Sequence, residues 1–280
     1  LANMTSGDDN TAVGKQALLN LSTGTRNTAV GQGSGDGLTT ANRTVIIGDS
    51  AGSGVMTTNA SASIPSYADG TVAIGYAALY ANTTGFANVA VGYKALEDNQ
   101  TGAYNTAVGY TALSNTTNNY NTAVGYASLV STVGGGGNTA MGHESLYANA
   151  STSNNTGIGY QAGFYTTGAS NTYVGHSAGK GASGAEANNV GVGKDALLAV
   201  TDGGANTSIG KDSSKAITDG HNNVAIGNNA LETSTSVGYV VAIGDDAMKS
   251  GNATSAADGT VAIGGSALMS LTTGEQNTAV

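Results

Sequence analysis

The sequence predicts an all-β fold, a parallel β-solenoid in which one short unit repeats along the whole chain. The first observation is a glycine, preceded by an apolar residue, that returns about every seventeen residues. The second is a strand-like run of Thr, Val, Ala and Ile before that glycine, and the third is a turn-forming composition elsewhere. Units this short cannot bury a core alone, so neighbouring copies must stack.

The repeat glycines define about sixteen coils in a single array over residues 1–280. The longest step between them, from Gly48 to Gly75, carries ten extra residues and the only proline, Pro65. Insertions in repeat proteins form surface loops, so a protruding loop is predicted near residues 53–69. The repeat glycines are Gly14, Gly31, Gly48, Gly75, Gly92, Gly109, Gly125, Gly142, Gly159, Gly175, Gly193, Gly210, Gly227, Gly244 and Gly264.

Each coil is predicted to start with a strand of four or five residues that ends at the glycine, as in Thr71-Val72-Ala73-Ile74-Gly75. The residues one and three before the glycine are mostly β-branched and share one face, because they lie two apart. We expect this face, Thr included, to point into the coil and the small middle residue to point outward. With Thr turned inward, an ice-binding surface is not expected.

After the glycine, the third residue is always Ala or Ser and the fourth is mostly Leu. This pair predicts a second short extended piece with an inward Leu, followed by a polar return. Four residues before the glycine, Asn stands in twelve of sixteen coils, and stacking at about 4.8 Å predicts a ladder of side-chain amides. Exceptions interrupt the Leu column at Gly35, Gly52, Gly163, Gly179 and Ser214, and the middle strand column at Ile46, Gly157, Tyr173, Gly191 and Ser208.

The interior of such a coil is small, since it offers about three aliphatic side chains for seventeen ordered residues. Additional burial between chains is therefore expected. The columns of small residues, among them Ala17, Ala78 and Ser128, would permit close approach, so we predict a homotrimer around a common axis.

Composition excludes several classes of function. The chain has 9 Lys plus Arg against 18 Asp plus Glu, and a net charge of −9 opposes binding to nucleic acid or to an anionic membrane surface. There is no cysteine for disulfides or thiolate metal sites, and no apolar run is long enough for membrane insertion. The start at Leu1 and the stop within a repeat at Val280 suggest a piece of a longer chain.

The motif Thr71-Val72-Ala73-Ile74-Gly75, with a small residue three positions later, resembles the head repeats of trimeric autotransporter adhesins. The fuller form, Asn105 to Leu113, is similar to repeats of bacteriophage tail-fibre proteins of the marine and cyanophage type. The resemblance implies a left-handed β-roll, a trimer and a virion location, with a fibre shaft that presents a tip to a host glycan or receptor. The alternative is a bacterial surface adhesin or extracellular filament built of the same repeat.

Few residues suggest chemistry. The histidines are His143, His176 and His221, and the first two stand two coils apart, too far to share one metal ion within a chain. The neighbouring carboxylates Asp245 and Asp246 are typical of a solvated surface. No nucleophile, phosphate-binding or calcium motif is present, so we expect no enzyme activity and no metal or other cofactor.

One aromatic column is the best candidate for recognition, because a tyrosine follows the repeat glycine in five coils. Stacked rings there predict a structural ladder that stiffens the sheet, with a carbohydrate-binding strip as the alternative. The tyrosines are Tyr76, Tyr93, Tyr110, Tyr126 and Tyr160.

Overall fold

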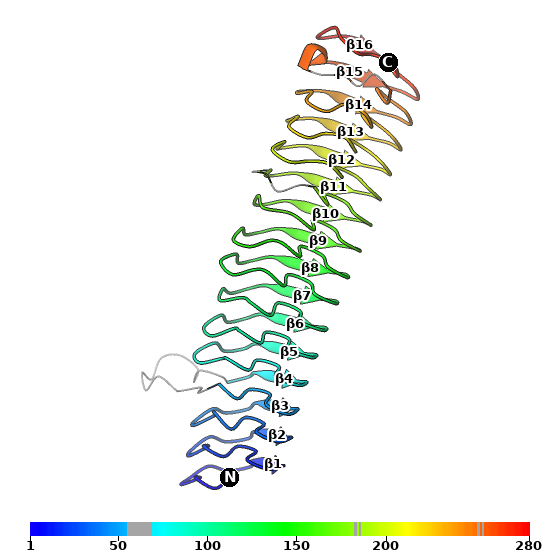
Figure 1. Ribbon diagram of the computed structural model, residues 1–280. Coiled ribbons are helices and arrows are strands. Elements are labelled where there is room, and N and C mark those ends of the chain that lie inside the picture. Colours follow the sequence, from blue (N-terminus) through cyan, green and yellow to red (C-terminus); the bar gives the residue numbers. More distant parts are fainter. Residues whose placement is uncertain (55–68, 182–183, 185, 251–252, 254) are drawn as a thin grey trace. The chain divides into compact units, whose positions relative to one another are not determined.

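The computed structural model describes residues 1–54, 69–181, 184, 186–250, 253 and 255–280 (Figure 1). Over these residues the chain is all-β apart from one 3-10 turn, η1 (Ser255–Ala257), and every strand pair is parallel. The predicted β-solenoid is confirmed, with one strand in each coil. The chain divides into two compact units, Leu1–Asn138 and Thr139–Val280. Most of the predicted loop near residues 53–69 lies outside the described residues.

The first unit contains seven described strands, which pair consecutively (Figure 1). Each has three residues rather than the predicted four or five, and pairing is in register, as with Ala73 opposite Ala90. The strands are β1 (Thr11–Val13), β2 (Thr28–Val30), β3 (Val45–Ile47), β4 (Val72–Ile74), β5 (Val89–Val91), β6 (Thr106–Val108) and β7 (Thr122–Val124).

The second unit repeats this arrangement over nine described strands, again paired in sequence order. The strands are β8 (Thr139–Met141), β9 (Thr156–Ile158), β10 (Thr172–Val174), β11 (Val190–Val192), β12 (Thr207–Ile209), β13 (Val224–Ile226), β14 (Val241–Ile243), β15 (Val261–Ile263) and β16 (Thr278–Ala279).

The predicted orientation of the strands is wrong. The middle residue points into the coil and is fully buried in β2 to β15, whereas its two neighbours are partly or largely exposed. In most coils little space is left at this position: where Gly157 stands in the middle of β9, even an added Cβ would lie 2.8 Å from Leu146 Cγ and 2.9 Å from the Ala162 carbonyl oxygen. Ala, Gly or Ser therefore fills the middle of every described strand except β3 and β10, and the Val, Ile and Thr residues on either side of it face outward.

The columns of small Ala and Ser residues were predicted to lie at an interface between chains, and this placement is also wrong. Ala17, Ala78 and Ser128 are buried inside their own coils, at 3% exposure or less. An interface with another chain cannot use them, because the coil already encloses them. The interior of most coils thus includes the middle strand residue, the small residue and the Leu, together with further buried side chains such as Leu21, Val200 and Ile217.

The predicted second extended piece is replaced by a left-handed turn. Lys94 and Leu96, two and four residues after Gly92, have φ angles of 54° and 53°, and the equivalent residues of other coils repeat this conformation. Their N–H groups donate to the neighbouring coils, Lys94 to the Tyr76 carbonyl at 2.9 Å and Leu96 to the Ala112 carbonyl at 3.1 Å. These bonds offset the unfavourable backbone conformation and turn each Leu inward.

The position of the repeat glycine requires glycine for two reasons, its backbone conformation and the close approach of the next coil. Gly75 has a φ of +132°, and a Cβ built there would lie 2.4 Å from the Gly92 carbonyl oxygen of the next coil. Any side chain would meet backbone that cannot move aside. The same approach occurs at Gly14, Gly92, Gly109 and Gly227, whereas Gly264 meets no atom within 4 Å; Gly125 shares the positive φ, at 134°.

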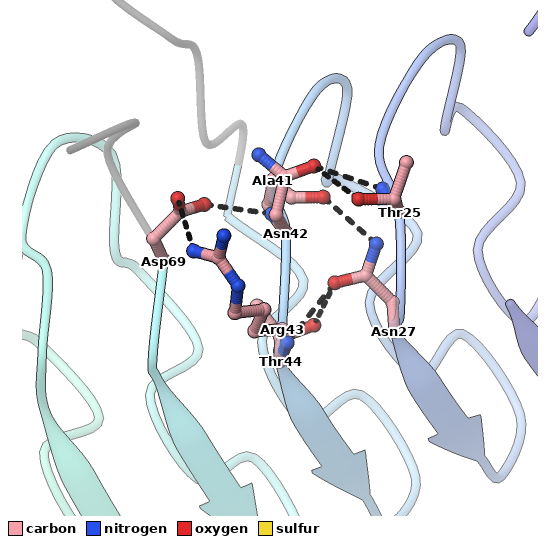
Figure 2. Close-up of polar contacts among 7 residues, drawn as sticks. All are labelled: Thr25, Asn27, Ala41, Asn42, Arg43, Thr44 and Asp69. Carbon is pink, nitrogen blue, oxygen red and sulfur yellow. Dashed lines mark hydrogen bonds and ion pairs between the residues drawn. The ribbon is translucent and has the colours of Figure 1, made fainter. Parts of the chain in front are cut away.

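The predicted asparagine ladder is confirmed. Its side chains bond to backbone groups of the next coil more often than to each other. Side-chain amides bond each other at Asn27–Asn10 (3.0 Å) and Asn223–Asn206 (2.9 Å). More commonly, Asn Oδ1 accepts the N–H at the same position of the next coil and Nδ2 donates to a carbonyl there. Figure 2 shows this for Asn27, which accepts from Thr44 N–H (3.0 Å) and donates to the Ala41 carbonyl (2.8 Å).

Asp69 anchors the chain where it returns from the longest step between repeats. Its Oδ1 accepts the Asn42 N–H at 2.7 Å, and Oδ2 lies 3.7 Å from Arg43 (Figure 2). In the preceding coil, Asn42 Oδ1 accepts the Thr25 N–H in the same way, at 2.9 Å. The long step therefore rejoins the regular hydrogen-bonding pattern, and β3 and β4 pair in register.

Candidate functional site

The tyrosine column of the first unit is a continuous stack of rings. Each tyrosine follows a repeat glycine, so parallel in-register stacking brings the rings face to face. The ring centroids are 5.3 Å apart for Tyr76–Tyr93, 4.9 Å for Tyr93–Tyr110 and 5.4 Å for Tyr110–Tyr126, with interplanar angles of 15° or less. All four side chains are about half exposed.

In the second unit the same column holds Tyr160 between two histidines. Ring centroids lie 5.2 Å apart for His143–Tyr160 and 5.0 Å apart for Tyr160–His176. The tyrosine ring stands between the imidazoles, so these histidines do not form a shared metal site. Within the described residues, no group of three or more His, Cys, Asp or Glu side chains could hold a metal ion.

This stacking bears on the two interpretations of the column. Binding a sugar by an aromatic ring requires a free ring face. Tyr93 and Tyr110 have both faces covered by neighbouring rings, which leaves their edges and hydroxyls exposed. The arrangement therefore favours a structural ladder. Two further stacked pairs, Tyr104–Tyr120 and Tyr147–Phe164, were not expected from the sequence, although their positions repeat from coil to coil.

The most extensive chemical feature is the outward side of the strands, which we call the Thr/Val face. It consists of the first and third residues of each strand, and the third column is aliphatic apart from Met141. Val13 is 57% exposed and Ile47 36%, and the other members are partly to largely exposed. The face is Thr11, Val13, Thr28, Val30, Val45, Ile47, Val72, Ile74, Val89, Val91, Thr106, Val108, Thr122 and Val124 in the first unit, and Thr139, Met141, Thr156, Ile158, Thr172, Val174, Val190, Val192, Thr207, Ile209, Val224, Ile226, Val241, Ile243, Val261, Ile263 and Thr278 in the second.

A second feature is a buried polar group in the second unit. Tyr173 occupies the middle of β10, the position that usually holds Ala, and is fully buried. Glycines make room for its ring: an added Cβ would lie 2.2 Å from it at Gly179 and 3.0 Å from it at Gly163. These glycines stand at two of the gaps in the Leu column. The tyrosine hydroxyl is buried beside the Asn189 side chain and makes no hydrogen bond of good geometry.

Glu186 is the other member of this group and is 2% exposed. Its Oε1 accepts the Thr167 N–H at 3.2 Å, while Oε2 is buried without a partner. Burial raises the pKa of Glu186 to about 7, and nearby Asp202 acts in the same direction. Burial, together with the charge of Glu186, also raises the pKa of Tyr173. Tyr173 and Glu186 were not identified from the sequence as a buried polar group. A signal was present, because Tyr173 and Gly179 both depart from the repeat pattern within one coil.

No protein-family model matches this sequence, and no curated protein matches it at a significant level. In the described part of the chain, no helix has the length and apolar character needed to cross a membrane. Interpretation of the surfaces therefore depends on their geometry.

Proposed function

We propose that this chain is part of the shaft of a bacteriophage tail fibre, a homotrimeric structural element that presents a tip to a host-cell glycan or receptor. The observation that carries the proposal is the uniformity of the coils. All adjoining described strand pairs within each unit are parallel and in register, and hydrogen bonds continue around the turns. Such a structure extends by addition of identical units, as a shaft requires.

The chemistry of the surface agrees with a structural role. The aromatic columns are occupied by their own stacking, and the net charge of −9 disfavours nucleic acid as a partner. We propose no enzymatic reaction and no cofactor. The alternative function is a bacterial surface adhesin or an extracellular filament, supported by the resemblance of the Thr71–Gly75 motif to adhesin head repeats.

Immunogold electron microscopy tests the location. Antibodies raised against residues 139–280 are applied to virions and to cells from the source culture, with antibodies pre-absorbed on the pure protein as control. Gold on the tail fibres of virions is the expected result. Gold on uninfected cells, or on filaments detached from cells, would replace the tail-fibre proposal by the alternative.

A further inference from the structure

We propose that the Thr/Val face is the surface on which copies of this chain associate. The inference rests on the proposed fibre function, since it names the surface that joins the chains of the shaft. It also moves the interface away from the Ala and Ser columns, which are enclosed within the coils.

The chemistry of the face fits an apolar contact. No charged residue stands on it in any of the sixteen described strands, although the chain carries 27 charged residues. Valine and isoleucine fill most of it, and the strands β3, β4 and β5 present only aliphatic side chains. Large exposed apolar patches on soluble proteins mark contact surfaces.

The face is substantial in each unit. Three residues make it about 10 Å wide, and strands spaced about 4.8 Å apart make it about 34 Å long over β1–β7 and about 43 Å long over β8–β16. Each unit thus offers about 340 or about 430 Å², which is about half of the ~800 Å² that each partner contributes to a standard interface.

A second copy of the chain is the occupant that the geometry favours. Within each unit both surfaces would carry rows at the same spacing, so the side chains of one copy can fit between those of another. The backbone groups of the strands are already paired, which leaves side-chain packing as the mode of association. Contact through an uncharged face also keeps the negative charges of the copies apart.

The test is light scattering coupled to size exclusion, on the full chain. The unmodified protein is expected at three times the chain mass of 27.2 kDa. The variant Ile47→Lys with Ile209→Lys places a charge on the face in each unit, at residues 36% and 40% exposed. It is expected at the mass of one chain, with an unchanged far-ultraviolet circular dichroism spectrum, since these positions tolerate charge in a free chain.

The matched control is Val133→Lys with Met269→Lys. These side chains are 56% and 38% exposed, one in each unit, and lie outside the strands. The control and the conservative variant Ile47→Val with Ile209→Val are expected to keep the mass of the unmodified protein. Together they show whether a loss of association depends on where the lysines are placed or only on the addition of charge.

Two results would overturn the inference. One is a folded single chain for the unmodified protein at micromolar concentration, and shaping of ice crystals by that chain would assign the face to ice instead. The other is a lysine variant of the face that keeps the oligomeric mass. Either result would leave the tail-fibre location standing if gold still labels tail fibres, although a single chain would remove the homotrimer from that proposal. Label on cells with a trimeric mass would remove the tail-fibre location alone.

Discussion

The coils of β6 and β10 fill their interiors with different residues. In the β6 coil, Ala107 on the strand faces the buried Leu113 after the glycine. In the β10 coil, Tyr173 takes the strand position and Gly179 takes the Leu position, where any side chain would meet the ring. The comparison teaches that the interior volume of a coil is conserved, whereas the residue that fills it is not.

The first unit contains a second example. Ile46 replaces Ala in the middle of β3, and Gly52 replaces Leu in the same coil. A Cβ added to Gly52 would lie 3.1 Å from Ile46 Cδ1. Two of the exceptions in the Leu column are therefore paired with a large residue in the strand of the same coil, Gly52 with Ile46 and Gly179 with Tyr173. Gly35, Gly163 and Ser214 have a small residue in the middle of their own strand.

The largest expected effect comes from emptying the β10 coil. Tyr173→Ala removes a fully buried ring between glycines and is expected to destabilise the second unit by about 3–5 kcal/mol. Adding Gly179→Leu recreates the β6 arrangement and should recover part of this loss. Hydrogen exchange of the β9–β11 amides measures both. If the double variant is less protected than Tyr173→Ala alone, the conserved-volume explanation fails.

The buried carboxyl group of this coil predicts a pH dependence that the β6 coil lacks. Burial raises the pKa of Glu186 from 4.5 to about 7, so the folded chain holds a proton that the unfolded chain releases. The contribution of this group to stability is then fully present below pH 4.5 and is lost as the pH rises through about 7. Glu186→Gln should remove this slope in hydrogen exchange of the surrounding amides.

The control for the pH experiment is Glu275→Gln, at an exposed carboxyl of the same unit. It should leave the slope unchanged. A slope that persists in Glu186→Gln would assign the proton to another group.

A smaller effect is expected from the asparagine ladder, which the ordinary coils share. Asn105 Oδ1 accepts the Asn121 N–H at 2.9 Å, and Nδ2 donates to the Asn118 carbonyl at 2.8 Å. Asn105→Ala leaves these groups without partners and should cost about 1–3 kcal/mol. Urea unfolding measures the change against Asn115→Ala, an exposed residue with one side-chain bond. Equal losses in the two variants would contradict a special role for the ladder.

An effect of similar size at most is expected at the tyrosine stack. Tyr93→Ala removes two ring contacts at the surface and should lower stability by about 1–3 kcal/mol at most, since each aromatic pair contributes about 0.5–1.5 kcal/mol. Tyr80→Ala, at a residue equally half exposed but outside this column, is the control for thermal unfolding. A glycan array then separates the two interpretations, because loss of sugar binding by a folded Tyr93→Ala variant would favour the carbohydrate strip.

The sequence by itself determined the period, the place of each strand, the parallel stacking and the glycine corners. These features follow from local preferences, because β-branched residues before a glycine such as Gly75 favour a strand and the turn-forming residues elsewhere favour corners. The stack of Tyr76, Tyr93, Tyr110 and Tyr126 followed as well, because one column in a stacked repeat places like residues together, whereas the pairs Tyr104–Tyr120 and Tyr147–Phe164 were not expected. The left-handed turn after each repeat glycine could not be predicted in the same way. Leu96 adopts a φ of 53° there, and leucine is not a residue type that indicates a turn.

Only the tertiary structure decided which side of each strand faces inward. Alternation along Thr106-Ala107-Val108 is the same for either orientation, so the pattern alone does not distinguish them. The left-handed turns bring the returning chain so close to the strand that the interior admits a methyl group opposite Leu. That narrow width turned the alanines inward and the valines outward, and thereby made the Thr/Val face a surface.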